Sequence, residues 1–297
     1  MIGKILSCVG GIYTVISDGI LYSCAAKGAF RHDKTVPMAG DEVELEPDGE
    51  KGFITKILPR KNSLIRPEVA NIDVMFIVFA LRSPDPNLLS IDKLTVLAEH
   101  SSIDAVIVFN KRDIADGEKG EELADIYKRA GYTVVVLSAA ENMDEVREKL
   151  FPIARGKVAV FTGPSGVGKS TIINALYPDL ELETGVISEK NRRGKNTTRT
   201  TTLYKTKEND GTYLVDTPGF TLLDFDRFRF MKKEELVFAF REYAPLATDC
   251  RYTKCTHTKE EGCNIIARVK MGDIAKSRHE SYIALFNILK NKPKWKK

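Results

Sequence analysis

The segment from Gly163 to Ser170, which reads G-P-S-G-V-G-K-S, constrains the fold of this 297-residue chain more than any other. The largely apolar segment 157–162 before it predicts a buried strand, and a helical pattern begins near Lys169. A glycine-rich loop between strand and helix is typical of a phosphate-binding loop, because backbone N–H groups and the helix N-terminus converge on phosphate oxygens. A turn without a ligand is the alternative, but it accounts less well for the strand and helix on either side.

This loop predicts specific contacts with a nucleoside triphosphate. Lys169 is expected to contact the β and γ phosphates, and the Ser170 hydroxyl is expected to bind Mg²⁺. The loop alone does not distinguish ATP from GTP. The residues predicted to bind the nucleotide here are Gly163, Pro164, Ser165, Gly166, Val167, Gly168, Lys169, Ser170 and Thr171.

A second polar motif follows the predicted strand at residues 104–109 and consists of Asn110, Lys111, Arg112 and Asp113. The Asp113 carboxylate would accept hydrogen bonds from N1–H and the exocyclic amine of guanine, a pair that adenine does not offer. The Lys111 stem would lie over the base, and Asn110 would tie this loop to the phosphate loop. Ser138 and Ala139 end the next predicted strand and would back the base from the other side. The alternative is an ordinary polar loop in a P-loop ATPase or kinase, because four residues form a weak pattern.

Two further segments have the composition of nucleotide-sensing loops. Asp216 ends a predicted strand at residues 212–215, where it would hold Mg²⁺ through water, and the Gly219 N–H would bond the γ phosphate. An ordinary Pro-Gly turn is the alternative. The threonine-rich residues 191–202 are expected to be disordered without nucleotide, and we assign the second Mg²⁺ hydroxyl to Thr198. The other candidates for that hydroxyl are Thr197, Thr200 and Thr201.

The order of these motifs is unusual, since Ras-like GTPases begin with the phosphate loop and this chain begins with the base-reading motif. Joining the two ends of such a GTPase domain and opening the chain at a different loop gives this order. The sequence therefore predicts a circular permutation. Phe220 stands where many GTPases carry the glutamine that orients the attacking water. We therefore expect slow hydrolysis unless another group or a partner positions that water.

Three segments with different patterning suggest three domains. Short strands with turn signals over residues 1–67 predict a small barrel, either an OB-fold or an SH3-like barrel. Alternating strands and helices over residues 68–222 predict a parallel sheet with helices on both faces. Residues 223–297 carry a net charge of +7 and predict helices at 232–243 and 277–291. That charge would suit a phosphate backbone.

Three of the five cysteines lie within 14 residues and have a histidine beside them. A set of three thiolates and one imidazole is typical of a closed, structural zinc site, and it would hold together a segment with a thin core. Free buried cysteines are the alternative. The predicted ligands are Cys250, Cys255, His257 and Cys263.

Composition excludes several other classes of protein. Hydrophobic residues make up 43% of the chain, enough for packed cores, and no apolar run approaches the length of a membrane span. Five cysteines do not make a disulfide scaffold in 297 residues. We expect a cytoplasmic protein that does not bind membranes and is a monomer.

Taken together, the motif order, the zinc cluster and the segment from Asn62 to Asn71 resemble the small-subunit-dependent GTPases of the RsgA (YjeQ/YloQ) family over essentially the whole chain. The resemblance implies an OB-fold, a circularly permuted GTPase domain and a zinc domain. It also implies GTP hydrolysis to GDP with Mg²⁺ and one structural zinc ion, stimulated by the 30S subunit during its late maturation, with binding to 16S rRNA. The family commonly has a histidine where this chain has Asn196, so Asn196 is only a candidate for positioning water.

Two other functions remain open at this point. The chain would be a nucleotide-gated RNA or protein adaptor if its hydrolysis were incidental, which Phe220 and Asn196 favour. It would be an ATPase or kinase if the base-reading motif were accidental. For RNA contacts in the barrel, the candidates are Arg31, Lys34, Lys51 and Lys56.

Overall fold

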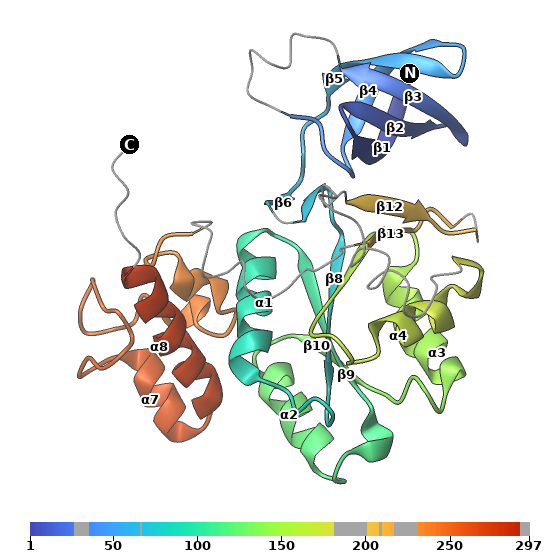
Figure 1. Ribbon diagram of the computed structural model, residues 1–297. Helices are drawn as coiled ribbons and strands as arrows, with labels where there is room; N and C mark the ends of the chain where they lie inside the picture. Colours follow the sequence, from blue (N-terminus) through green and yellow to red (C-terminus); the bar gives the residue numbers. More distant parts are fainter. Residues whose placement is uncertain (27–35, 66, 181–200, 208–209, 217–230, 292–297) are drawn as a thin grey trace. The chain divides into compact units, whose positions relative to one another are not determined.

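The computed structural model describes residues 1–26, 36–65, 67–180, 201–207, 210–216 and 231–291 (Figure 1). These residues form two compact units, each assembled from separate stretches of the chain. Unit 1 contains Met1–Met75, Val146–Thr162 and Ser170–Phe220, and unit 2 contains Phe76–Glu145, Gly163–Lys169 and Thr221–Lys297. Among the described residues, no helix is both long and apolar enough to cross a membrane.

The N-terminal part of unit 1 is a closed five-stranded barrel, as predicted. Its strands are β1 (Ile2–Val9), β2 (Ile12–Ser17), β3 (Ile20–Ala26), β4 (Glu42–Asp48) and β5 (Lys51–Ile57). Strand β2 pairs antiparallel with both β1 and β3, and β3 pairs in parallel with β5. Strand β4 pairs antiparallel with both β5 and β1. The β1–β4 pairing closes the sheet on itself and gives the OB-type barrel rather than the SH3-like alternative.

Local sequence explains this barrel. Side chains alternate between buried and partly exposed along β2, which is the period of a strand with one face in a core. The β2–β3 turn is made by Asp18 (φ 49°) and Gly19 (φ 82°), so both positions take the left-handed conformation that an Asp-Gly hairpin predicts. The barrel core consists of Ile5, Tyr13, Val15, Tyr22, Cys24, Val43, Leu45 and Ile54.

The rest of unit 1 contains a short hairpin, three further strands and most of two helices, whose first residues belong to unit 2. The hairpin pairs β6 (Ser63–Ile65) with β7 (Glu68–Ala70). Strand β11 (Val158–Thr162) runs parallel to β13 (Tyr213–Asp216), and β13 pairs antiparallel with β12 (Thr202–Lys205). The helices are α3 (Met143–Ala154) and α4 (Lys169–Leu176), and a 3₁₀ turn, η3 (Pro178–Leu180), follows.

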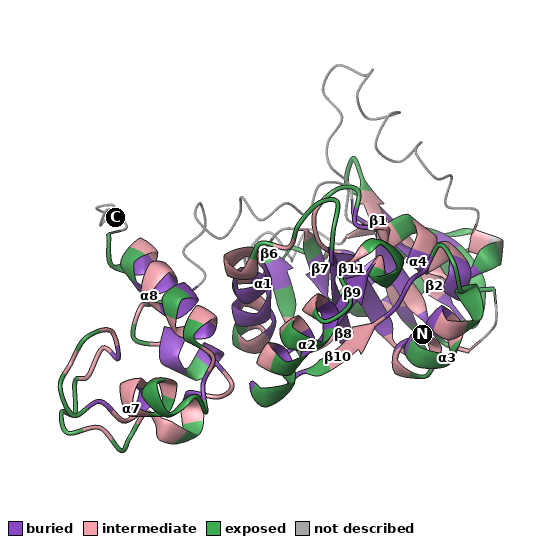
Figure 2. Cartoon of the chain, turned by 90° about the horizontal axis from the view of Figure 1, so that it is seen from below, coloured by how far each residue is buried: buried purple, intermediate pink, exposed green. Residues whose placement is uncertain are grey.

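In unit 2, parallel strands carry the base-reading motif. The sheet order is β10 (Thr133–Val136), β9 (Asp104–Asn110) and β8 (Val74–Ala80), and β9 and β10 are parallel. All seven residues of β8 are buried, as expected for a strand covered on both faces (Figure 2). Helices α1 (Leu88–His100) and α2 (Lys119–Arg129) accompany these strands, and the 3₁₀ turn η2 (Arg112–Ile114) lies between β9 and α2.

The C-terminal part of unit 2 is mainly helical, but one predicted helix is wrong. In place of a helix over residues 232–243, the structure has the 3₁₀ turn η5 (Leu236–Ala239). A second 3₁₀ turn, η6 (Ala244–Leu246), follows. The backbone of Phe240 is extended, which interrupts the helix while the ring enters the core. Two α-helices follow, α7 (Asn264–Met271) and α8 (Lys276–Lys290). Their core includes Val96 of α1, so this segment shares a hydrophobic core with the preceding one.

Candidate functional site

A single buried side chain joins three of the predicted nucleotide-binding segments. Asn110 ends β9 and is 3% exposed. Its Nδ2 donates to the Val167 carbonyl of the glycine-rich loop at 2.9 Å, and its Oδ1 accepts from the Ala139 N–H at 3.0 Å. Asn110 therefore holds the base-reading loop, the Ser138-Ala139 loop and the phosphate loop together.

The glycines of the phosphate loop allow this close approach. A Cβ on Gly168 (φ +96°) would lie 2.2 Å from Nδ2 of Asn110, and one on Gly163 (φ +140°) would lie 2.0 Å from the carbonyl oxygen of Val78. Both contacts are far too short for a real Cβ atom. A Cβ on Gly166 would meet nothing within 4 Å. Gly163 and Gly168 thus determine how closely the loop packs on β8 and on Asn110.

The base-reading loop presents an exposed carboxylate. Asp113 lies in η2, exposed to solvent, and its Oδ1 accepts a hydrogen bond from the Ser138 hydroxyl. Lys111 takes a left-handed conformation (φ 62°), and its ammonium group donates to the Ser83 carbonyl. Such a backbone conformation reverses the chain immediately after the buried strand. Asp113 consequently stands at the carboxyl end of β9, where ligands of parallel sheets bind.

Lys169 is the first residue of α4, and its side chain folds over the phosphate loop. Its ammonium group donates to the carbonyls of Gly163 at 2.8 Å and Pro164 at 2.7 Å. Burial lowers the pKa of this lysine, because desolvation disfavours its charged form. Phosphate oxygens bound at this position would give the Lys169 ammonium group a negatively charged partner in place of the two neutral carbonyl oxygens.

Of the other residues predicted to bind Mg²⁺ or the γ phosphate, the structure describes some and not others. Ser170 is exposed in the first turn of α4, and Thr171 follows it at intermediate exposure. Asp216 is the last residue of β13, where it is the antiparallel partner of Thr202. Thr201 is 9% exposed. The following predicted residues lie outside the described ones: Asn196, Thr197, Thr198, Thr200, Gly219 and Phe220.

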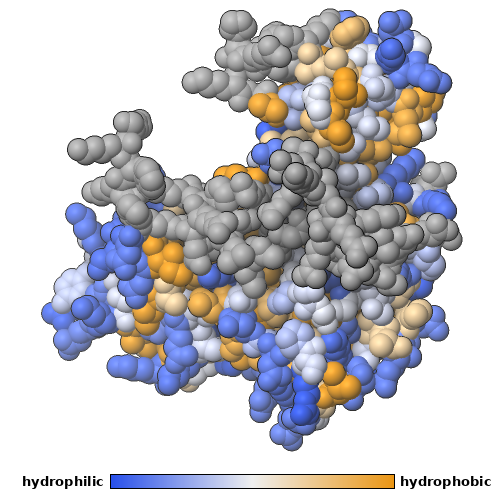
Figure 3. All heavy atoms as spheres, in the orientation of Figure 1, coloured by the Kyte–Doolittle hydropathy of each residue, from blue (hydrophilic) through white to orange (hydrophobic). Residues whose placement is uncertain are grey.

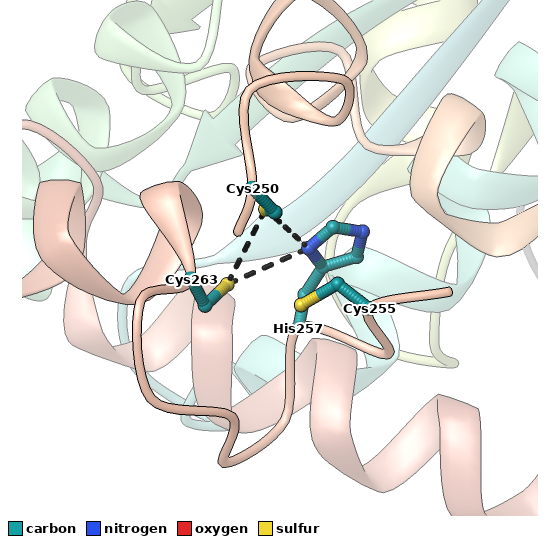
Figure 4. A group of neighbouring side chains, drawn as sticks. All are labelled: Cys250, Cys255, His257 and Cys263. Carbon is teal, nitrogen blue, oxygen red and sulfur yellow. Dashed lines mark hydrogen bonds between the residues drawn. The ribbon is translucent and has the colours of Figure 1, made fainter. Parts of the chain in front are cut away.

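The four predicted metal ligands come together in the segment before α7 (Figure 4). Nδ1 of His257 lies 3.5 Å from the sulfur of Cys250 and 3.5 Å from that of Cys263, and these two sulfurs are 3.8 Å apart. With Cys255, all four ligand atoms lie within 4.8 Å of one another. This set could hold one metal ion.

Hydrogen bonds from outside the cluster fix the loop that carries it. The Glu260 carboxylate accepts from the backbone N–H groups of Thr256, Thr258 and Lys259 at 2.8–3.1 Å. Burial opposes ionisation of this carboxyl, but a bond from the Thr256 hydroxyl and these backbone bonds outweigh it and lower its pKa to about 2. Tyr282 of α8 donates to the Thr256 carbonyl at 3.1 Å, so the C-terminal helix also supports the loop.

Two thiols of this cluster, those of Cys255 and Cys263, are poorly placed to ionise on their own. Burial raises the pKa of Cys255 to about 12, and the neighbouring thiols add to that rise. Burial also raises the pKa of Cys263. Since thiolates bind metal ions, a cation at the centre would reverse this preference by stabilising the negative charges.

Sequence reasoning missed a buried ionic network in unit 2. Arg278 of α8 is 1% exposed and donates to Asp92 of α1 at 2.6 Å and to both oxygens of Glu242 at 2.8 and 3.0 Å. Its guanidinium also lies 4.5 Å from the ring centroid of Phe240. Arg241 similarly pairs with Glu99 of α1 at 2.6 Å. No sequence spacing links these partners.

Comparison with known proteins agrees with this arrangement. The family model for the RsgA GTPase matches residues 57–226, and the model for the RsgA N-terminal domain matches residues 2–54. The chain is 41% identical over 291 residues to the small ribosomal subunit biogenesis GTPase RsgA of Alkaliphilus metalliredigens, covering 97% of each. It is 43% identical over 286 residues to the protein of the same name from Clostridium novyi, covering 95% of each.

Solved structures support the same family. The crystal structure of YjeQ from Thermotoga maritima is 34% identical, with a TM-score of 0.84 over 98% of this chain and 99% of the other. The structure of YloQ, described as a circularly permuted GTPase, is 28% identical, with a TM-score of 0.78 over 99% of this chain and 96% of the other. The predicted circular permutation and the predicted GTP hydrolase activity are therefore those of the family. The chain belongs to the RsgA GTPase family.

Proposed function

We propose that this GTPase acts in the biogenesis of the small ribosomal subunit, binding the 30S particle and its 16S rRNA and hydrolysing GTP there. The observation that carries the nucleotide-binding part is the pair of hydrogen bonds made by Asn110 to Val167 and Ala139. The ribosomal part rests on relatives that are named small ribosomal subunit biogenesis GTPases. A cytoplasmic, monomeric protein that does not bind membranes would suit this role.

Guanine would be read by the exposed loop after β9. The Asp113 carboxylate would accept two hydrogen bonds from guanine, while the Ser138 hydroxyl holds it in place. Lys111 would cover one face of the base. Asn110 would position these groups, and Ala139 would back the base from the other side. Adenine lacks the paired donors, so Asp113 would exclude ATP.

The phosphates would lie along the glycine-rich loop, with Lys169 on the β and γ phosphates. Hydroxyl and carboxylate oxygens suit Mg²⁺, and Ser170, Thr198 and Asp216 would hold it. When bound, this ion would neutralise charge that develops on the phosphates. Gly219 would donate to the γ phosphate. Asn196 is the candidate for orienting the attacking water, and Phe220 leaves that task to it or to the ribosomal partner.

One zinc ion is proposed for the cluster of Cys250, Cys255, His257 and Cys263. Tetrahedral zinc with bonds of about 2.3 Å to sulfur and 2.0 Å to nitrogen places two sulfurs about 3.8 Å apart and sulfur and nitrogen about 3.5 Å apart. The cluster has these separations, at 3.8 and 3.5 Å. With four protein ligands the ion would be structural, and it would hold the loop before α7.

The proposed domains are an OB-fold at residues 1–67, a GTPase domain at 68–222 and a zinc domain at 223–297. In the barrel, β5 exposes Lys51, Lys56 and Phe53, a mixture of cations and an aromatic ring that suits RNA. Lys56 also pairs with Glu44 at 3.2 Å. Figure 3 shows hydrophobic atoms on the visible face of the barrel. Arg31 and Lys34 lie outside the described residues.

Sedimentation with purified ribosomal subunits tests this proposal. We expect the protein to pellet with 30S particles when a non-hydrolysable GTP analogue is present, and less so with GDP or with 50S particles. D113N supplies the control, because it should pellet with the xanthosine analogue instead of the guanosine analogue. Equal pelleting with 30S and 50S particles, or no dependence on the nucleotide, would refute the ribosomal assignment.

A further inference from the structure

Arg112, the third residue of the base-reading motif, makes contacts that the proposed nucleotide site does not use. It lies between Lys111 and Asp113, and its backbone N–H donates to the carbonyl of Leu137, the residue after β10. The guanidinium forms two parallel hydrogen bonds to one carboxylate, from NH1 to Oε1 of Glu145 at 3.0 Å and from NH2 to Oε2 at 3.1 Å. This paired geometry fixes orientation as well as distance.

Glu145 is a firm anchor for that guanidinium. It lies in the first turn of α3, where the helix dipole favours a negative charge, and its side chain is only 12% exposed. The Asn142 side chain accepts from its backbone N–H at 2.9 Å. The Asn142 N–H in turn donates to the carbonyl of Ser138 at 3.0 Å. The backbone of Glu145 is therefore tied to the loop that begins at Ser138.

These contacts join the same two loops at two points. Ser138 holds the Asp113 carboxylate directly, and Glu145 holds the residue immediately before Asp113. Because Asp113 is exposed and lies in a short 3₁₀ turn, it has little packing of its own. Fixing the backbone on its N-terminal side restricts where its carboxylate can point. The Arg112–Glu145 pair also cancels a positive charge beside the site.

We propose that Arg112 and Glu145 are positioning residues for guanine recognition. They hold Asp113 in the orientation that accepts both guanine donors, and they contact neither the base nor the phosphates. This inference rests on the proposed nucleotide site. It predicts that loss of the ion pair weakens the contact with the 2-amino group of guanine more than the contact with N1–H, because two bonds need a better aligned carboxylate than one.

The test compares binding of GDP with binding of inosine diphosphate, which lacks the 2-amino group. We expect R112Q and E145Q each to weaken GDP binding by about fivefold, the effect of one well-formed, half-exposed ion pair. Binding of inosine diphosphate should change by less than half as much. R112K, which keeps the charge but loses the paired geometry, should fall between.

R268Q is the matched control, because Arg268 forms an exposed ion pair with Asp273 at 2.9 Å in the C-terminal part. It should leave both affinities unchanged. Wild-type affinity for GDP in R112Q and E145Q would overturn the inference alone. So would an equal loss for both nucleotides, since that would indicate general destabilisation. Failure of the wild-type protein to bind GDP at all would overturn the proposed nucleotide site as well.

Discussion

Replacing Arg278 with methionine removes the centre of the ionic network between α1 and α8. The guanidinium is 1% exposed, its partner Asp92 is fully buried, and Glu242 is 9% exposed. R278M keeps much of the side-chain volume but leaves two buried carboxylates without their cation. The variant therefore isolates the electrostatic part of the contact from its packing.

The expected loss in the free energy of unfolding is about 3–5 kcal/mol, the cost of removing one partner from a buried ion pair. Two carboxylates favour the upper half of this range. Burial already raises the pKa of Asp92, although Arg278 opposes that rise. In R278M the opposition disappears, so Asp92 takes up a proton more easily. A carboxyl whose pKa is higher in the folded than in the unfolded state destabilises the fold as the pH rises, because it must ionise while buried. R278M should therefore lose more stability at pH 8 than at pH 5.

Chemical denaturation at both pH values provides the assay, and thermal unfolding should show a drop of about 6–20 °C in Tm. R268Q, which breaks an exposed ion pair, should lose no more than about 1 kcal/mol. Neutralising the orphaned groups in D92N/E242Q/R278M should recover part of the stability. A loss in R278M as small as that in R268Q would refute the reasoning, and so would a loss independent of pH.

Three further predictions concern the nucleotide site and the metal. D113N should shift binding from GDP towards xanthosine diphosphate, because the new amide donates a hydrogen bond where the carboxylate accepted one from guanine. Competition between the two nucleotides measures this preference, and an unchanged preference would show that Asp113 does not read the base. G168A should weaken GDP binding at least tenfold, because its Cβ would collide with the amide of Asn110. G166A, which meets no atom within 4 Å, should weaken it less, and equal losses in a titration would contradict this account. Removal of the metal by a strong chelator should lower Tm and release one zinc ion per chain, measured with a zinc dye; an unchanged Tm would argue against a structural ion.

The sequence predicted those features that depend on neighbouring residues. The helix expected at residues 88–100 is α1 (Leu88–His100), and Asn87 caps it by accepting from the Ser90 N–H at 2.9 Å. The barrel and the four clustered metal ligands were likewise predicted from turn signals and ligand spacing. For the nucleotide site, the expected tie between Asn110 and the phosphate loop has a counterpart in its bond to Val167.

Features that depend on tertiary packing were not predictable in this way. Arg278 lies 186 positions from Asp92 and 36 from Glu242, and in sequence it looks like one more charge on an exposed helix face. The helix expected at residues 232–243 fails because the backbone of Phe240 is extended. The rings of Phe240 and Tyr243 both pack beside Tyr282. Sequence reasoning also missed α7, although Gly272, left-handed at φ 85°, marks its end.

The most direct test of the account is GTP turnover by the purified protein, alone and with 30S subunits, with 50S subunits as the control. We predict slow turnover alone, since Phe220 cannot orient water, and strong stimulation by 30S subunits only. GTP binding without stimulation by 30S subunits would contradict the proposed role and would favour an adaptor in which hydrolysis is incidental.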